Sequence, residues 1–205
     1  MNIRYREEKS KFHLSKRQKL VLIGTLLGDG NLTQHGKNFR LFVKHSGSQF
    51  SLAEWKRKEF SKMTKMKLNF FQQEVKGKTY EFCQFATLTH PEFNQYWKIF
   101  YSKSKKIIPK EINAILVHPL SLMVWIMDDG ARDNVGITIQ THNFSHAGIQ
   151  RLQGCLRKNF GILVTIRKNK KREIIYIPKS QIKKLYRLVK KHLLPEYKYK
   201  FPLAP

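Results

Sequence analysis

Two aspartates stand at matching places in this 205-residue chain, each directly before the glycine that ends an apolar run. Asp29 precedes Gly30 and Asp129 precedes Gly130, so the two acids are 100 residues apart. One Asp-Gly pair is a common turn former that ends a helix, but two pairs in register indicate a shared role. Carboxylate oxygens are hard ligands suited to Mg²⁺, and metal ions that bridge a phosphate stabilise its attacking and leaving oxygens. The pair therefore predicts a divalent-cation site for phosphodiester hydrolysis.

Each aspartate follows a segment that predicts a buried helix. The first segment begins at Ser15, with Gln18 at capping-box spacing, and is mostly apolar as far as Leu27. The second begins at Pro119, a residue favoured at the first position of a helix, and stays apolar as far as Met127. Two such helices packed through their last turns would bring both carboxylates and the negative ends of both helix dipoles to one place.

The two opening helices differ where they are expected to touch. Gly24 and Gly28 lie one turn apart in the first helix and allow another backbone to approach closely. Val124 and Asp128 replace them in the second helix, and Trp125 is bulky. We therefore expect an asymmetric helix pair, which suits a fused monomer better than a symmetric homodimer.

Both halves of the chain predict the same order of elements, α-β-β-α-β-β-α. The predicted segments are 15–27, 39–44, 51–63, 67–75, 79–88 and 91–101 in the first half, and 119–129, 136–141, 145–159, 162–168, 173–177 and 179–192 in the second. The strand directly after each opening helix is poorly defined, and residues 102–109 are expected to form a connector. The fold class is therefore α+β, with antiparallel sheets and two pseudo-twofold-related halves, 1–110 and 111–205.

The charge of the chain is strongly basic. It has 40 Lys and Arg residues against 14 Asp and Glu residues, a formal net charge of +26. Such an excess concentrates polyanions, so nucleic acid or an anionic membrane surface is the expected partner. Because 41% of the residues are hydrophobic and 12% are aromatic, the chain can build a core and is not a disordered basic tail.

Several classes of protein are excluded by the sequence. Cys83 and Cys155 are isolated in apolar segments, which excludes a disulfide scaffold and a zinc finger. We find no secretion signal and no apolar stretch of the ~20 residues that a membrane span needs, so a soluble protein of a reducing compartment is expected. The segment 28–31 lacks the Lys-Ser/Thr of a phosphate-binding loop.

Two nine-residue segments resemble the signature of the LAGLIDADG homing endonucleases. Residues 22–30 read LIGTLLGDG and residues 122–130 read LMVWIMDDG. The resemblance extends to the repeated order of elements and to the tail at 194–202, and it is closest to the single-chain, two-motif, intron-encoded members found in organelles.

This resemblance implies a site-specific double-strand DNA endonuclease whose sheets form a DNA-binding saddle. It implies Mg²⁺ as the cofactor, with Mn²⁺ or Ca²⁺ able to replace it for binding, and one active site for each DNA strand. It further implies a monomer that cuts a long pseudo-palindromic target across the minor groove and leaves short 3′ overhangs. The expected location is inside the cell, in an organelle by resemblance, with a bacterial cytoplasm left open.

The resemblance also assigns the metal site. The eighth motif position, Asp29 in one copy and Asp129 in the other, binds the metal. Gly28 and Asp128, which precede them at position seven, are predicted as further residues of the metal site. Because the helix interface is expected at position seven, the ligand role is assigned to Asp29 and Asp129.

Two lysines end the two halves in similar contexts. Lys106 precedes Ile-Ile-Pro and Lys200 precedes Phe-Pro, and the family places active-site lysines in such segments. A lysine there can orient water or balance charge that develops on the phosphate. The alternative is that either lysine contacts phosphate or is simply solvated.

The strands are predicted to carry the DNA contacts. A twisted antiparallel ribbon can lie in the major groove, where Arg and Lys read guanine, Asn and Gln read adenine, and other basic residues contact phosphate. The residues at suitable positions are Arg40, Lys44, Gln72, Lys76, Lys78, Gln140, Arg167, Lys168, Lys170, Lys171 and Arg172.

Two other functions stay open at the level of sequence. The family uses the same scaffold for maturases, which bind intron RNA and assist its splicing. A catalytically silent DNA-binding protein would keep the salt-sensitive affinity but lose the metal dependence. The presence of both acids favours the nuclease, because a pure binder gains nothing from two like charges beside a polyanion.

Overall fold

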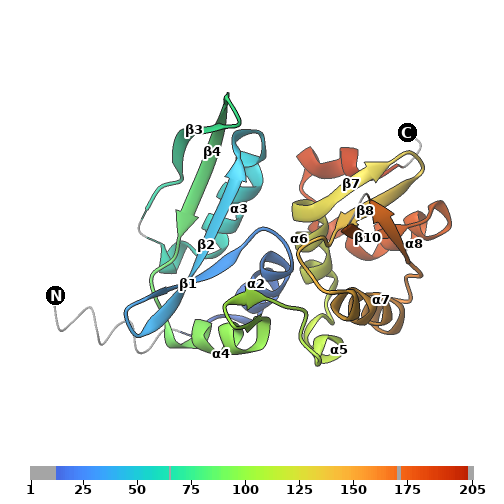
Figure 1. Cartoon of the computed structure of the whole chain (residues 1–205), viewed down its shortest axis with the longest axis horizontal. Coiled ribbons are helices and arrows are strands. Elements are labelled where there is room, and N and C mark those ends of the chain that lie inside the picture. The colour runs from blue at the N-terminus through green and yellow to red at the C-terminus, as the bar shows by residue number, and fades with distance from the viewer. Residues whose placement is uncertain (1–12, 65, 170–171, 203–205) are drawn as a thin grey trace. The chain divides into compact units, whose positions relative to one another are not determined.

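A computed structural model describes residues 13–64, 66–169 and 172–202, and within these ranges no helix is long and apolar enough to cross a membrane. The chain forms two compact units (Figure 1). The first extends up to Leu20 and continues over Gly30–Ile99, and the second combines Val21–Asp29 with the chain from Phe100 onward. The two units therefore differ from the two halves predicted from the sequence, 1–110 and 111–205, because the second unit includes the C-terminal part of the first opening helix.

The first opening helix, α2, spans Lys16–Leu27. Its start is the predicted capping box: the N–H of Ser15 donates to Oε1 of Gln18 over 2.9 Å, and the N–H of Gln18 donates to Oγ of Ser15 over 3.2 Å. The helix ends at Leu27, so that the following two residues form a turn that leads into the first strand.

The first unit contains a four-stranded antiparallel sheet in the order β1-β2-β4-β3. Its elements are β1 (Asn31–His35), β2 (Asn38–Ser46), α3 (Phe50–Glu59), β3 (Asn69–Val75), β4 (Lys78–Ala86) and α4 (Pro91–Phe100), with short 3₁₀ turns η1 (Gly47–Gln49) and η2 (Ser61–Met63) around α3. The helix predicted at 51–63 thus ends as an α-helix at Glu59.

One face of this sheet forms the core of the first unit and the other is open. Leu41 and Val43 of β2 and Cys83 of β4 are fully buried, and α3 packs against both strands. Since side chains alternate along a strand, Phe42 and Lys44 point to the opposite face. That open face is amphipathic rather than purely basic.

The second unit contains α6 (Pro119–Asp129) and a second four-stranded sheet in the order β7-β8-β10-β9. Its other elements are β5 (Tyr101–Ser102), β6 (Lys105–Lys106), α5 (Ile112–Ile115), β7 (Gly130–Asp133), β8 (Gly136–Gln140), α7 (His146–Phe160), β9 (Thr165–Asn169), β10 (Arg172–Ile177), α8 (Lys179–Val189), η3 (Lys190–His192) and η4 (Pro195–Lys200). Four fully buried isoleucines of β8 and β10 face the helices: Ile137, Ile139, Ile175 and Ile177.

The predicted repeat is confirmed, since both halves have the order α-β-β-α-β-β-α and equivalent strand orders. The strands that the sequence left poorly defined are β1 and β7. The predicted connector at 102–109 contains a small hairpin, β5–β6, which the sequence did not indicate.

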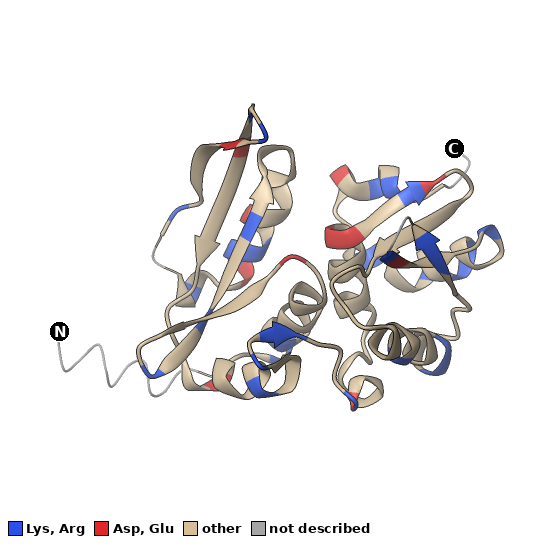
Figure 2. Ribbon diagram, viewed as in Figure 1, with Lys and Arg blue, Asp and Glu red and all other residues tan. Residues whose placement is uncertain are grey.

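Basic residues occur along strands of both sheets, as the blue segments of the ribbon in Figure 2 show. Arg40 and Lys44 lie on β2, and Arg167 and Lys168 lie on β9. The charge of the chain is therefore not confined to its loops.

Candidate active site and nucleic-acid interface

The ends of α2 and α6 approach closely within the second unit because α2 carries glycines there. A Cβ at Gly24 would overlap the carbonyl oxygen of Ser121 and lie 2.7 Å from Cβ of Val124. One turn later, a Cβ at Gly28 would overlap the carboxylate of Asp128 and lie 2.5 Å from its Cβ. The predicted close approach through these two glycines is confirmed, and it brings the C-terminal ends of both helices together.

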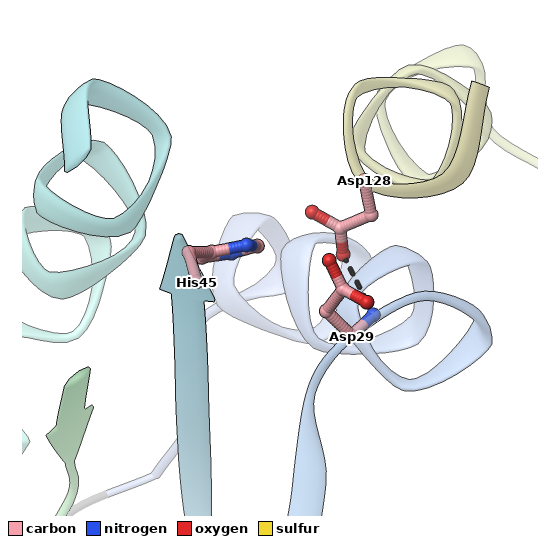
Figure 3. A group of neighbouring side chains, drawn as sticks. All are labelled: Asp29, His45 and Asp128. Carbon is pink, nitrogen blue, oxygen red and sulfur yellow. Dashed lines mark hydrogen bonds between the residues drawn. The ribbon is translucent and has the colours of Figure 1, made fainter. Parts of the chain in front are cut away.

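The carboxylates that meet at these ends belong to Asp29 and Asp128 (Figure 3). The N–H of Asp29 donates to Oδ2 of Asp128 over 3.2 Å, and one oxygen of each carboxylate lies within 4.8 Å of the other. Asp128 is 7% exposed, whereas Asp29 is partly open to solvent. Two carboxylates at this separation fit a hard divalent cation, which would offset their mutual repulsion. His45, also drawn, belongs to β2 of the first unit.

Asp129, which the motif pairs with Asp29, follows Asp128 in α6 and lies close enough to Asp29, Asp128 and Lys106 for their charges to act on its carboxyl. Successive residues of an α-helix are rotated by about 100°, so Asp128 and Asp129 cannot present their side chains in the same direction. Burial raises the pKa of Asp129 to about 8; the charges of Asp128 and Asp29 act in the same direction and that of Lys106 opposes them. The carboxylate that the structure groups with Asp29 is that of Asp128, and the metal-binding role of Asp129 stays a prediction from the motif.

Lys106 lies at the end of α2. Its ammonium donates a hydrogen bond to the carbonyl oxygen of Gly28 over 2.7 Å. The lysine is held by the β5–β6 hairpin, whose two turn residues, Lys103 and Ser104, have φ angles of 46° and 61°. A positive charge is favourable here because the last carbonyls of a helix lack partners within the helix and carry the negative end of its dipole.

Lys200 takes the same position at the end of α6. Its ammonium donates to the carbonyl oxygen of Met127 over 2.5 Å, and the carbonyl oxygens of Ile126 and Asp128 each lie 3.4 Å away. The lysine is 4% exposed, and its ammonium lies 5.3 Å from the centre of the Tyr197 ring. Lys200 is therefore part of the core of the second unit as well as of the candidate site.

The two lysines contact carbonyl oxygens near the ends of both opening helices. One lysine reaches the carbonyl of Gly28, directly before Asp29, and the other reaches that of Met127, directly before Asp128. The helices also end differently, since α2 stops one residue before Gly28 whereas α6 continues one residue past Asp128. By its shortest lysine contact Asp128 corresponds to Asp29, whereas by distance from the closing glycine Asp129 does.

Residues 19–185 match the LAGLIDADG DNA endonuclease family. The chain belongs to this family. The probable intron-encoded endonuclease 1 of Wickerhamomyces canadensis is 29% identical to it over 206 residues, which cover 91% of this chain and 84% of that protein.

Two further comparisons point to the same family. The cytochrome b mRNA maturase bI2 of Saccharomyces cerevisiae is 28% identical over 195 residues, covering 88% of this chain but 46% of the maturase, so the chain spans about half of that relative's length. The structure of the homing endonuclease I-WcaI bound to its DNA recognition sequence matches with a TM-score of 0.90 at 26% identity, covering 100% of this chain and 94% of that one.

In this LAGLIDADG chain the first sheet places most of its predicted DNA contacts on the open face. Arg40, Lys44 and Lys78 all lie there, as the strand register shows. Lys76 lies in the β3–β4 turn with a φ of 53°. Lys44 is less available than the sequence indicated, because its ammonium donates to Oε1 of Gln73 over 2.7 Å.

Gln72 does not have the position predicted for it. It lies opposite Glu81, on the face that also carries Cys83, and so points away from the open face. Gln73, the next residue, lies on the open face instead. The alternation of β3 alone could not reveal this, because β3 exposes residues on both faces and shows no burial pattern.

The predicted DNA contacts of the second sheet also lie on both of its faces. Gln140, Arg167 and Arg172 share its open face, whereas Lys168 pairs with Glu173 on the other face. Lys170 and Lys171 lie outside the described residues.

Arg167 has partners within the protein that the sequence did not predict. Its guanidinium lies 3.1 Å from the centre of the Tyr176 ring, and its Nη1 lies 3.6 Å from a carboxylate oxygen of Asp133. Tyr176 and Asp133 thus position the guanidinium of Arg167, one of the predicted DNA contacts.

Proposed function

We propose that this chain is a site-specific double-strand DNA endonuclease that hydrolyses phosphodiester bonds with Mg²⁺. The observation that carries the proposal is the meeting of Asp29 and Asp128 at the ends of two helices, each of which is capped by a lysine. In a chain with a net charge of +26, two acids at a shared site are best explained by a cation that they hold.

The donor atoms fit such a cation, and Asp29 and Asp128 would hold it. A bound Mg²⁺ supplies charge neutralisation at the phosphate and a water of lowered pKa. Gly28 contributes space rather than a ligand, because the Asp128 carboxylate occupies the volume that a side chain would fill. Lys106 and Lys200 fix the helix ends and place positive charge beside the site, where charge develops on the scissile phosphate.

The open faces of the two sheets are proposed to bind DNA. Arg40 and Lys78 of the first sheet and Gln140 and Arg172 of the second project from strands that alternate in direction, as a major-groove ribbon requires. One active site for each strand and short 3′ overhangs remain predictions from the family. Since one chain supplies both acids and both lysines, we propose that it acts as a monomer.

The proposal is tested by cutting a large randomised duplex library in Mg²⁺ and sequencing the new ends. Wild type should yield one long motif with short 3′ overhangs, and the Asp29→Asn/Asp128→Asn variant should yield none. The matched control is Glu111→Gln/Glu196→Gln, which removes two exposed acids of the second unit and should cut like wild type. Equal cutting by the aspartate variant would overturn the proposal.

A second candidate function is an RNA-binding maturase, which the similarity to the yeast cytochrome b mRNA maturase favours. A maturase would bind its intron RNA more tightly than duplex DNA and would keep that affinity in the Asp29→Asn/Asp128→Asn variant. Tight duplex binding without cutting in any metal would instead indicate a silent DNA-binding protein.

A further inference from the structure

An open hollow lies on the first sheet beside the β3–β4 turn. It has a volume of about 430 Å³ and is lined by Val75, Lys76, Lys78, Tyr80 and Phe82. Lys78, Tyr80 and Phe82 are alternate residues of β4, and Val75 lies opposite Lys78. The hollow therefore opens on the same face as Arg40 and Lys44, the face proposed to bind DNA.

The walls of the hollow are apolar although they are open to solvent. Tyr80 is 47% exposed and Val75 is 40% exposed, while Phe82 forms the floor and stacks on Phe71 with ring centres 5.8 Å apart. Single exposed apolar residues are ordinary. Several exposed apolar residues in one hollow of the sheet face proposed to bind DNA are unusual, because each of them loses the stabilisation that burial in the core would give.

Lys44 lies against the aromatic residues of this hollow. Its ammonium lies 4.1 Å from the centre of the Phe82 ring and 5.0 Å from that of Phe71, and it donates to Gln73. This arrangement holds the aromatic floor in place and occupies the ammonium. Lys76 and Lys78, which line the hollow beside the turn, add further positive charge.

An apolar floor with a basic rim matches one group in the major groove. The thymine C5-methyl is the apolar group that base pairs present there, and phosphates lie on either side of it. Lys78, Tyr80 and Phe82 span about 13 Å along β4, which corresponds to about four base pairs. We propose that this hollow receives thymine methyl groups, so that the target requires thymine at one or two positions within a window of about four base pairs. The inference rests on the proposed binding of duplex DNA.

The test is a binding selection, which does not depend on cleavage. Wild type, Val75→Ser/Tyr80→Ser and Phe70→Ser would each select from the same randomised duplex library at fixed salt. Phe70 is the matched control because it is 59% exposed on β3 but lies opposite Cys83, on the other face. Wild type and Phe70→Ser should recover the same motif, and the Val75/Tyr80 variant should lose the thymine preference at one or two positions only.

Replacing those thymines by deoxyuridine removes only the methyl groups. It should weaken wild-type binding about three- to fivefold per methyl, as burial of one methyl group implies, and leave the Val75→Ser/Tyr80→Ser variant unchanged. A wild-type motif whose thymines tolerate deoxyuridine, or a variant that keeps the thymine preference, would overturn the inference while the endonuclease stands. Selection of no duplex motif, with preference for unpaired RNA, would overturn both.

Discussion

The missing side chain at Gly28 decides where the Asp128 carboxylate lies. A Cβ at residue 28 would overlap that carboxylate, so Gly28→Ala must displace it or part the two helices. We expect cleavage to fall by about 100-fold or more, because small displacements of a reacting group have costs of that order. Stability should fall by about 1–3 kcal/mol, measured by urea unfolding.

Gly154→Ala is the control for that substitution. Residue 154 lies within α7, and a Cβ there would meet nothing within 4 Å. The variant should cut normally and gain about 0.5–1 kcal/mol of stability, since alanine favours a helix interior. Cleavage by Gly28→Ala at the wild-type rate would show that the position of Asp128 does not matter.

Lys200 supports the end of α6 from inside the core. Lys200→Met keeps most of the side-chain volume but leaves the carbonyl oxygens of residues 126–128 without this donor. We expect a loss of about 1–3 kcal/mol in the free energy of unfolding. Lys198→Met, which changes an exposed lysine of the same 3₁₀ turn, should alter it by less than about 0.5 kcal/mol. Equal losses in both variants would show that the carbonyl contacts contribute nothing.

At the scale of elements, the ends of the two opening helices explain what the sequence could and could not predict. Apolar runs and the Ser15 capping box predicted the bounds of α2 and α6 to within about one residue. The motif could not predict where the two helices end. The helix α2 ends at Leu27, whereas α6 continues to Asp129, which is two residues closer to the closing glycine of its motif. Side-chain direction depends on helical phase, and aligning the motif copies does not determine that phase.

The strands also show that a local sequence pattern predicts only some of the side-chain directions. Alternation in β2 predicted a face carrying Arg40 and Lys44, whereas β3 gave no such signal and its register depends on pairing with β4. The partners of Lys44 and Arg167 come from neighbouring strands, and no local pattern identifies them.

The start of α2 is tied to α4 through Glu92. The Glu92 carboxylate accepts hydrogen bonds from His13 over 2.9 Å and from the N–H of Leu14 over 3.2 Å, and Lys19 lies 3.4 Å away. Burial raises the pKa of Glu92, but these partners outweigh it and the net pKa is lowered.

Because the pKa of Glu92 is lower in the folded state than in the unfolded state, its ionised carboxylate stabilises the fold. This stabilisation is present above the unfolded-state pKa and is lost as the pH falls through the folded-state pKa. Glu92→Gln should therefore lower stability by about 1–2 kcal/mol at neutral pH and by much less at low pH. Urea unfolding at pH 7 and pH 3 measures this, with the exposed Glu111→Gln as the control. A loss of the same size at both pH values would contradict the assignment.

At the scale of the whole molecule, the net charge of +26 predicts affinity for DNA that falls steeply with salt. Lys76→Gln/Lys78→Gln removes two proposed phosphate contacts and should reduce the slope of log K against log salt by about 2. Lys190→Gln/Lys191→Gln removes the same charge from exposed positions on η3 and should change the slope less. Equal slopes in the two variants would mean that the β3–β4 turn does not touch the backbone.

The sequence predicted the repeat and the basic strands, because these follow from periodicity and residue type. It placed Asp29, Lys106 and Lys200 at the helix ends, and it named both Asp128 and Asp129 for the metal site of the second copy. The sequence could not predict that the N–H of Asp29 bonds to the carboxylate of Asp128, because this contact depends on packing of α2 against α6 and joins residues 99 positions apart.

The most direct test compares three single variants, Asp29→Asn, Asp128→Asn and Asp129→Asn, cutting the same recovered duplex target in Mg²⁺, with binding measured alongside. Asp29→Asn and Asp128→Asn should each lose cleavage while still binding the duplex, and Asp129→Asn should retain cleavage within about tenfold, because we propose that Asp29 and Asp128 hold the cation. Loss of cleavage in Asp129→Asn together with normal cutting by Asp128→Asn would contradict the account and favour the assignment made from the motif.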